Sequence, residues 1–188
     1  MSDPAQPTQP EPEPEPGPVT GPHRVTQITS GLIDAFAELW LRVSRAGGAV
    51  DFTPDVDPAE VRAAAMFAVS EASDPRSTML TVWRADDLVG VAFLVRGDRR
   101  VVEHSGRVVR LMVDPDLQGR GWGARLLDGC LDHARGQGME RLYLSARDGT
   151  GLPEYYRRRG WREVGRLPRA IRVAPGDERD EVWFHREV

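Results

Sequence analysis

Residues 109–127 read VRLMVDPDLQGRGWGARLL: an apolar strand, a proline-containing turn, three alternating glycines and an amphipathic helix. Glycine has no Cβ, so the backbone at Gly119, Gly121 and Gly123 can adopt positive φ and approach a ligand closely. The first N–H groups of a helix lack internal partners, and the helix dipole favours an anion beside them. Arg120 adds a positive charge. We interpret this stretch as a backbone cradle for a diphosphate.

A flexible connection between strand and helix is the simpler alternative for the same stretch. The glycines stand at positions 119, 121 and 123, which differs from the G-x-G-x-x-G spacing of dinucleotide-binding folds. The sequence also lacks an acidic residue at the end of a following strand, where such folds contact a ribose. A Rossmann domain is therefore not expected.

The composition of the chain excludes several function classes. It has 188 residues, 25 basic and 29 acidic side chains, and a net charge of −4; every basic residue is arginine, and asparagine is also absent. Without lysine, neither a Walker A loop nor Schiff-base chemistry is possible. Cys130 is the single cysteine, which excludes a disulfide framework, and we expect no metal site. The lack of lysine and asparagine suggests a GC-rich bacterial genome.

The sequence contains neither a long apolar run nor the pattern of a secretory signal. No stretch approaches the roughly 18 apolar residues of a membrane-spanning helix. The N-terminus has no basic segment followed by an apolar one. We therefore expect no membrane segment and a cytoplasmic location.

Residues 1–22 differ in composition from the rest of the chain. They hold eight of the fifteen prolines, four acidic residues and no basic ones. Such a segment buries too little apolar surface to fold, so we expect a disordered or polyproline-like tail that is either merely solvated or a docking peptide. Residues 23–188 form the expected single domain, in which 25 bases balance 25 acids and nothing indicates nucleic-acid binding.

Hydrophobic periodicity and turn residues predict an α/β domain with the order β-α-α-β-β-β-α-β-α-β-β, a mixed sheet with helices against it. The expected strands are residues 24–29, 78–84, 88–96, 107–113, 141–145, 161–166 and 181–186. The expected helices are residues 32–44, 58–73, 120–136 and 152–159. Asp57 is the expected N-cap of the second helix, with Pro58 at its first position.

Two motifs resemble those of the GCN5-related N-acetyltransferase (GNAT) superfamily. QGRGWG at residues 118–123 resembles the Q/R-x-x-G-x-G/A motif, and LMVDP before it resembles L-x-V-x-P. YYRRRGW at residues 155–161 resembles a second signature, (F/Y)-Y-x-x-x-G-(F/W). The order of elements over residues 24–188 also fits that superfamily. The final strands are similar to a bacterial branch that includes antibiotic- and toxin-resistance acetyltransferases.

This resemblance implies a mostly antiparallel GNAT-like sheet and transfer of an acetyl group from acetyl-CoA directly to a primary amine. It implies that the coenzyme's pantetheine arm lies in a gap beside a bulged strand, along Leu111, Met112 and Val113. It implies that the amides of the glycine motif hold the pyrophosphate, with the residues Gln118, Gly119, Arg120, Gly121, Trp122, Gly123 and Ala124. Tyr156 matches the family's acid, which protonates the leaving thiolate. The alternative for Tyr156, and the favoured interpretation for Tyr155, is packing.

The general base departs from the family pattern. Many members carry a glutamate where this chain has Arg107, which cannot accept a proton. We rank Glu103 first among the substitutes, ahead of His104 and Asp148, each with or without a water chain. The missing acid leaves a second hypothesis open, that of a non-catalytic acyl-CoA-binding regulatory or interaction module.

The acceptor is expected to be a small-molecule amine. In this fold it enters between the loops at residues 45–57 and 168–180, whose acidic residues would attract a cationic amine by electrostatic steering. Those residues are Asp51, Asp55, Asp57, Asp177, Glu178 and Asp180. The resemblance also makes a homodimer through the last strands possible. Arg157–Arg159 either reach the 3′-phosphate of coenzyme A or form a solvated basic face.

Overall fold

The computed structural model describes residues 17–188, which form one seven-stranded sheet with the strand order β1-β2-β3-β4-β5-β7-β6. Adjacent strands are antiparallel except for the pair β4 and β5, which is parallel. The strands are β1 (Val19–Arg24), β2 (Ser77–Arg84), β3 (Asp87–Arg96), β4 (Ser105–Val113), β5 (Arg141–Arg147), β6 (Arg162–Ala174) and β7 (Asp177–Glu187). The helices are α1 (Ser30–Arg45), α2 (Pro58–Glu71), α3 (Trp122–Gly136) and α4 (Leu152–Arg158), with a 3-10 turn, η1 (Pro115–Leu117). This order confirms the predicted mixed, mostly antiparallel topology.

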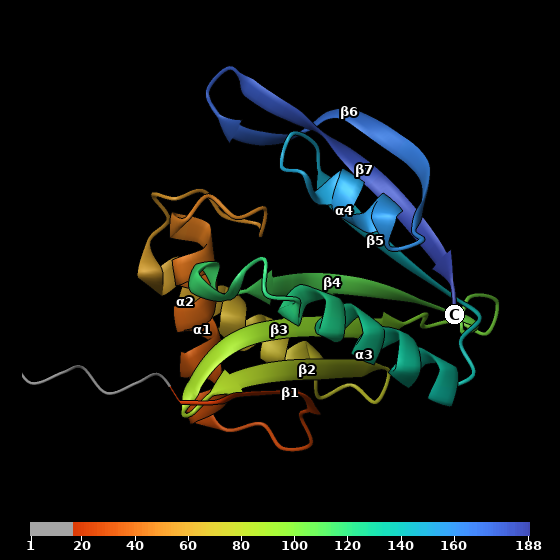
Figure 1. Cartoon of the computed structure of the whole chain (residues 1–188), viewed down its shortest axis with the longest axis horizontal. Helices are drawn as coiled ribbons and strands as arrows, with labels where there is room; N and C mark the ends of the chain where they lie inside the picture. The colour runs from red at the N-terminus through yellow and green to blue at the C-terminus, as the bar shows by residue number, and fades with distance from the viewer. Residues whose placement is uncertain (1–16) are drawn as a thin grey trace, which may run out of the picture.

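The sheet separates two apolar cores, and helices lie on both of its faces (Figure 1). Helices α1 and α2 pack on one face and α3 and α4 on the other. Neighbouring residues of a strand therefore join different cores: Met79 belongs to the core under α1 and α2, and Leu80 to the core under α3 and α4. No helix within residues 17–188 is long and apolar enough to cross a bilayer.

Strand β5 is covered more completely on one face than on the other. Leu142, Leu144 and Ala146 are buried in the core under α3 and α4, whereas the residues that alternate with them are half-buried. The face of β5 that points away from α3 and α4 is therefore accessible. This accessibility matters because β5 is one of the two strands of the parallel pair.

Both N-terminal helices, α1 and α2, begin at a residue whose side chain accepts a hydrogen bond from an amide of the first turn. The Thr29 hydroxyl accepts a hydrogen bond from the Leu32 amide at 3.1 Å, which begins α1. The Asp57 carboxylate accepts from the Ala59 amide at 2.9 Å, with Pro58 at the first position of α2. The predicted cap of the second helix is thus confirmed.

The prediction for the first strand is wrong. The strand occupies Val19–Arg24 instead of residues 24–29, and it pairs with β2 at the edge of the sheet. A register shift between Thr20 and His23 accommodates the Gly-Pro pair at residues 21–22. An edge strand tolerates proline because part of its backbone has no ladder partner. The predicted boundary after residue 22 is therefore also wrong, and the rest of the predicted tail, residues 1–16, lies outside the described residues.

The last two strands are longer than predicted. β6 and β7 extend through most of the expected loop at residues 168–180, leaving only Pro175 and Gly176 as the connection. The segment from 162 to 170 is exposed throughout, so it lacks the alternation of buried and exposed side chains that identifies strands in a sequence. Cross-strand contacts such as Arg172 with Glu178 hold this hairpin instead.

Candidate functional site

The glycine loop, which we define as residues 118–123, leads into the N-terminus of α3. Gly119 and Gly121 have φ values of 75° and 87°, in the left-handed region that glycine adopts most readily. A Cβ at either position would have no atom within 4 Å, so both glycines border open space. Gly121 is the N-cap of α3, and within residues 17–188 no side chain caps it. The amides of the first turn are therefore available to a ligand.

Asp114 holds the turn that precedes the glycine loop. It is 4% exposed, and its carboxylate accepts hydrogen bonds from Arg42 Nε at 2.8 Å and from the Asp116 amide at 3.1 Å. The Asp114 amide donates to the Val89 carbonyl at 2.8 Å, and Arg42 donates to the Leu88 carbonyl at 3.0 Å. This network ties α1 and β3 to the loop. It fixes where α3 begins. The sequence indicates only the turn, through the Asp-Pro pair, and not the distant partners of Asp114.

Strand β4 carries a bulge just before the glycine loop. Val91–Phe93 of β3 oppose Val109–Met112 of β4, so β4 has one extra residue in this part of the ladder. Arg110 within the bulge has a φ of 51°, a conformation that is strained for a residue other than glycine. A bulge bends the strand that contains it, so this one turns β4 away from its neighbour.

The Arg110 side chain is held on the α1 and α2 side of the sheet. Its guanidinium carbon lies 5.7 Å from the ring centroids of Trp40 and Phe93, and its Nη2 atom lies 3.6 Å from Glu71 Oε2. Cation–π attraction and this ion pair offset the strained backbone. Arg110 cannot be identified from the sequence, because the left-handed conformation of an arginine does not change the hydrophobic pattern.

Beyond a short paired segment, β4 and β5 separate. Residues 105–107 of β4 pair with residues 141–143 of β5, and no described pairing continues past them. β4 nevertheless runs on to Val113 and β5 to Arg147. The β5 side of this part of β4 therefore has no strand partner, and an extended ligand could add there as a strand would. This is the bulged and separated strand pair that the family resemblance implied.

The three residues expected along the pantetheine arm differ in their exposure. Leu111 and Val113 are half-buried beside the core under α3 and α4. The Met112 side chain is buried among α1 and α2 residues, so only its backbone is available to a ligand. Gln118 Nε2 donates to the Val113 carbonyl at 3.1 Å, and that oxygen keeps a second lone pair for another donor.

Basic side chains surround the glycine loop. Arg120 is exposed, and the Arg125 guanidinium lies over the Trp122 ring, 4.6 Å from its centroid. The free amides, the open glycines and these cations together fit a ligand that carries a diphosphate. The separated strands fit a long extended arm attached to that diphosphate.

Tyr156, the predicted acid, belongs to the aromatic part of the core under α3 and α4. Its ring centroid lies 5.4 Å from that of Tyr155, 6.2 Å from that of Trp161 and 5.7 Å from that of Phe184. Leu144, on β5 past the paired segment, joins the same core. Burial raises the pKa of Tyr156, so the hydroxyl stays protonated at neutral pH.

Tyr155 lies closer to the glycine loop than a purely packing residue would require. A Cβ on Gly123 would stand 3.3 Å from the Tyr155 hydroxyl. That hydroxyl is buried and has no hydrogen-bond partner among residues 17–188. Desolvation raises the pKa of Tyr155, against the opposing charge of Arg159. The side chain therefore presents an unused polar atom where α3 meets α4.

The structure does not bring the first-ranked bases to the gap between β4 and β5. Glu103 and His104 lie in the turn between β3 and β4, where β4 is still paired with β5. At about 3.3 Å per residue, the seven residues from Glu103 to the bulge at Arg110 correspond to roughly 20 Å. The Glu103 backbone carbonyl accepts from Arg96 Nε, which fixes the turn. Strand length thus argues against Glu103, the residue ranked first, and against His104.

Asp148, the third candidate, is closer to the gap but is already engaged. It follows β5, and its carboxylate accepts from Arg166 Nη1 at 2.8 Å and from the Gly149 amide at 3.0 Å. The Arg166 hydrogen bond, with that of Gly149, lowers the pKa of Asp148. A lowered pKa makes this carboxylate a weaker base, so it is an ion-pair partner first.

The accessible face beside the gap carries arginine and aromatic side chains. The Arg107 guanidinium lies over the Trp183 ring, 4.8 Å from its centroid. Arg147 Nη2 donates to the Gly47 carbonyl at 2.9 Å, which joins the end of β5 to the connection between α1 and α2. Arg107 thus occupies the family's glutamate position as a stacked cation. The Arg147 contact cannot be predicted from the sequence, because its partner is a backbone group 100 residues away.

Most acidic residues of the expected acceptor loops have partners. Glu178 accepts from Arg169 Nε at 2.6 Å and from Arg172 Nη2 at 2.7 Å, and Asp177 accepts from Arg179 Nη2 at 3.0 Å. The others with partners are Asp55 with the Thr53 hydroxyl, Asp57 with the Ala59 amide and Asp180 with the Arg169 amide. Arginines face Asp177, Glu178 and Asp180, which reduces the long-range attraction of residues 168–180 for a cationic acceptor, whereas Asp55 and Asp57 accept only from neutral groups and keep their charges.

Comparison with known protein families gives one match. The sequence profile of the acetyltransferase (GNAT) family matches residues 40–161, which include β4, the glycine loop and α4. A search of curated proteins finds no significant match.

Solved structures of similar fold include several acetyltransferases. A GNAT-family acetyltransferase from Streptococcus pneumoniae has a TM-score of 0.70 and 17% identity, covering 88% of this chain and 100% of that one. A ribosomal-protein-alanine N-acetyltransferase from Brucella melitensis has a TM-score of 0.69 and 17% identity, covering 86% of this chain and 97% of that one. A ribosomal L7/L12 α-N-protein acetyltransferase in complex with coenzyme A has a TM-score of 0.68 and 17% identity, covering 86% of this chain and 91% of that one. At these identities the similarity establishes the fold.

Proposed function

The chain belongs to the GNAT family of acetyltransferases and is an acetyl-CoA-dependent N-acetyltransferase, and we propose that its acceptor is the primary amine of a small molecule. The observation that carries the proposal is the free N-terminus of α3 next to the separated strands β4 and β5. Acetyl-CoA supplies an activated acetyl group as a thioester. The residues of the chain have to hold the coenzyme, place that thioester against an amine and stabilise the leaving thiolate.

The amides from Gly119 to Ala124 hold the pyrophosphate in this proposal. Several aligned N–H groups and the positive end of the helix dipole suit an anion, and Arg120 adds a mobile charge. The backbone of Leu111 and Val113 pairs with the amide groups of the pantetheine arm, as a neighbouring strand would. Because main-chain groups make these contacts, the side chains of β4 need only be apolar.

Tyr156 is the residue we assign to the leaving group. Its place in the core beside the far part of β5 supports this assignment, as does its match to the family motif. The raised pKa keeps the hydroxyl protonated but also makes it a weak acid relative to a thiol, whose pKa is about 8.5. We therefore expect Tyr156 to donate a hydrogen bond to the thiolate as charge develops on sulfur.

We assign no side chain as the general base. Glu103 and His104 are remote from the gap, and Asp148 is bound to Arg166. The amine then loses its proton to solvent, which the accessible face of β5 admits. The acceptor's own pKa, and no protein group, should set the rise of the rate with pH.

The acceptor proposal draws on the accessible face beside β5. Arg107 stacked on Trp183 forms a flat apolar and cationic surface there, and Arg147 closes one side through its bond to Gly47. Such a surface suits a compact amine that also carries a planar or anionic group. We also propose a cytoplasmic location, because the chain has a single cysteine.

A homodimer through β6 completes the proposal. β6 forms one edge of the sheet, and its side chains Val164 and Leu167 are 57% and 50% exposed. An exposed edge strand can pair with another copy of itself. Sedimentation at two protein concentrations tests this part.

The experiment that tests the function measures release of the CoA thiol when the protein is mixed with acetyl-CoA and a panel of amines. The panel contains small primary amines with neutral, cationic and anionic second groups, and peptides with N-terminal alanine or serine. We expect release with a small amine in the panel. Thiol release with the peptides alone would contradict the small-molecule assignment. If coenzyme A binds but none of the acceptors gives thiol release, the non-catalytic alternative is supported.

A further inference from the structure

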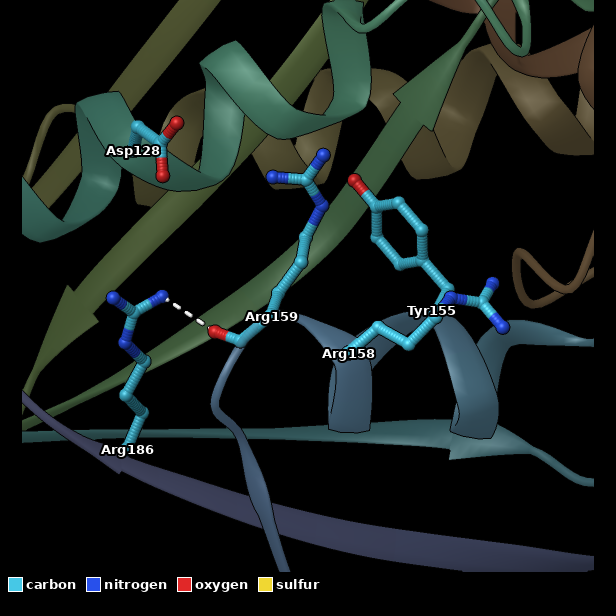
Figure 2. Close-up of a pocket in the computed structure, with 5 residues that line it drawn as sticks. All are labelled: Asp128, Tyr155, Arg158, Arg159 and Arg186. Carbon is cyan, nitrogen blue, oxygen red and sulfur yellow. Dashed lines mark hydrogen bonds between the residues drawn. The ribbon is translucent and has the colours of Figure 1, made fainter.

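Two pockets lie beside α3, and one of them adjoins the glycine loop. That pocket lies between α3 and α4 and is lined by Asp128, Tyr155, Arg158, Arg159 and Arg186 (Figure 2). Its Tyr155 approaches Gly123, so it belongs to the coenzyme side of the molecule. The second, which we call the edge pocket, lies at the C-terminal end of α3 and has a volume of about 720 Å³. Its lining consists of residues 24–28 and 72–79 with Arg96, His133, Gln137 and Met139.

The edge pocket forms where the chain leaves the sheet after β1. The Val25 amide still donates to the Met79 carbonyl of β2 at 2.9 Å, and no described pairing between the two segments follows it. Residues 26–28 then run apart from the start of β2 at Ser77. Residues 72–76, between α2 and β2, and the last turn of α3 line the space between them. Three parts of the chain thus surround a pocket at the edge of the sheet.

The floor of the edge pocket is apolar and reaches the core. Met79 and Met139 line it and are 1% and 6% exposed. Val25 and Ile28 add apolar surface nearer the solvent. The volume lies within the range of about 300–1,000 Å³ that is typical of small-molecule sites. The edge pocket can therefore cover the apolar part of a small ligand.

Arg24 and Arg96 lie on the face of the sheet that α3 covers. Arg24 is in register with Leu80, which is buried in the core under α3 and α4. Arg96 alternates along β3 with Leu94 of the same core. Leu80 pairs with Ala92, four residues before Arg96, so two strand spacings and four residues of strand put the two arginine Cα atoms roughly 16 Å apart. The two arginines therefore stand on opposite sides of the edge pocket.

The edge pocket carries more positive than negative charge. Three arginines and one carboxylate line it, so its net formal charge is +2. Arg76 neutralises the carboxylate: its Nε donates to Asp74 Oδ1 at 2.9 Å, and its hydrogen bonds lower the pKa of Asp74 to about 2. Among the described residues, neither Arg24 nor Arg96 forms an ion pair. Arg96 Nε donates to the Glu103 carbonyl at 2.7 Å, which leaves its other N–H groups available.

The other polar groups of the edge pocket do not reverse this sign. His133 Nε2 lies 2.9 Å from the Thr78 hydroxyl oxygen. Desolvation, together with the positive charge of Arg24, lowers the pKa of His133, so its ring is neutral at neutral pH. The last carbonyls of a helix favour a cation, but those of His133, Ala134 and Arg135 accept hydrogen bonds from the amides that follow α3. The two available arginines therefore determine the charge that a ligand must carry.

We propose that the edge pocket binds a short linear dicarboxylate. Each of the two available guanidinium groups can bind one carboxylate through two parallel N–H···O bonds. A dianion matches the net formal charge of +2. The methylene groups between the carboxylates lie on the apolar floor, which a fully polar anion would leave uncovered. A cation is disfavoured because it would meet like charges on both sides.

The edge pocket is remote from the glycine loop. From Gly121, the N-cap of α3, to His133 the helix rises by about 18 Å at 1.5 Å per residue. A dicarboxylate in the edge pocket therefore does not compete with a diphosphate at the glycine loop. The assignment is independent of the acetyltransferase proposal.

Titration of the full chain with the linear dicarboxylates from succinate to suberate tests the assignment. Calorimetry gives the affinity, and the NMR signals of the His133 ring and of the amides of residues 26–28 give the place of binding. We expect saturable binding of at least one dicarboxylate. The monocarboxylate and the dimethyl ester of the same chain length should bind at least about tenfold more weakly. The bound dianion should also raise the pKa of His133, because negative charge favours the protonated ring.

Two variants and a matched control locate the charges. Arg24→Gln and Arg96→Gln should each lower the affinity for the dicarboxylate by about tenfold or more. Arg135→Gln is the control, because Arg135 lies on the last turn of α3 but does not line the edge pocket and is bound to Asp132 at 2.7 Å. Its affinity should equal that of the wild type. Thermal unfolding checks that each variant is folded.

Three results would overturn the assignment. They are the absence of saturable binding by every dicarboxylate of the series, equal binding of a dicarboxylate and its dimethyl ester, and equal losses of affinity in Arg96→Gln and Arg135→Gln. None of these results bears on coenzyme binding at the glycine loop, so the proposed function would remain.

Discussion

The glycine loop and the β6–β7 hairpin are both exposed, but they hold their shapes by different means. The loop depends on backbone conformation at Gly119 and Gly121 and on the buried carboxylate of Asp114. The hairpin depends on ion pairs at its surface, such as those that the half-buried Glu178 makes with the exposed Arg169 and Arg172. The first arrangement fixes the direction of amide groups, whereas the second leaves side chains free to vary.

This difference indicates which part of the reaction each region can serve. Main-chain amides recognise a diphosphate, a group common to every use of the coenzyme, and need no particular side chains. Exposed charged side chains contribute little to stability and can change without loss of the fold. We therefore expect the glycine loop to determine coenzyme binding and the hairpin to affect the acceptor. Four substitutions test that division.

Gly121→Ala should have the largest effect. The residue has a φ of 87°, where a Cβ costs roughly 1–2 kcal/mol, and a backbone that relaxes would turn its amide out of the cradle. We expect the affinity for coenzyme A to fall by about a hundredfold, measured by calorimetry. Gly136→Ala, at the other end of α3, is the control: it has no positive φ and no atom within 4 Å of the added Cβ. Similar losses in both variants would contradict the role of the loop.

Asp114→Ala should affect stability as well as coenzyme binding. It removes the acceptor of Arg42 Nε and of the Asp116 amide, and both donors lose a charged partner inside a buried turn. We expect a loss of about 2 kcal/mol in the free energy of unfolding in urea. Coenzyme affinity should fall too, because the start of α3 is no longer fixed. Unchanged affinity in a folded variant would show that the loop holds its conformation alone.

Tyr156→Phe tests the chemical step between the two regions. The change removes one hydroxyl and keeps the packing against Trp161 and Phe184, so coenzyme affinity should not change. We expect thiol release to slow more than about tenfold. Because burial raises the pKa of Tyr156, the wild-type rate should not fall from ionisation of this group below about pH 10. An unchanged rate would remove Tyr156 from the mechanism.

The coenzyme side of the molecule could be predicted from the sequence to a large extent. Glycines at 119 and 121, an apolar strand before them and a helix after them are local features, and the structure has all three. The caps at Asp57 and Pro58 are local for the same reason. The sequence does not reveal the contacts from distant residues that hold the loop, such as the hydrogen bond from Arg42 of α1 to Asp114. These two residues are 72 positions apart, so their contact follows from the fold and not from a motif.

The acceptor side was predicted less well for a related reason. The hairpin from β6 to β7 has no apolar alternation, so residues 168–180 appeared as a loop. Its acidic residues appear free in the sequence because Arg169 and Arg172, which pair with Glu178, come from the opposite strand; only Arg179, which pairs with Asp177, lies on the same strand. Glu103 ranked first as the base because it precedes the strand in sequence, but the paired start of β4 keeps it away from the gap.

Glu178→Gln should have the smallest effect, and it tests whether the β6–β7 hairpin affects the acceptor and not the coenzyme. The Glu178 side chain is 17% exposed and contacts Arg169 and Arg172, so the change frees two guanidinium groups on the hairpin. We expect the free energy of unfolding to change by less than about 1 kcal/mol, because both arginine partners are exposed and surface ion pairs contribute little. Affinity for coenzyme A should stay within twofold, whereas the KM for the acceptor should shift by a few-fold, upward for a cationic amine and downward for an anionic one. A loss of coenzyme affinity instead would mean that the hairpin and the glycine loop are coupled through β5, and the separation of the two roles would be wrong.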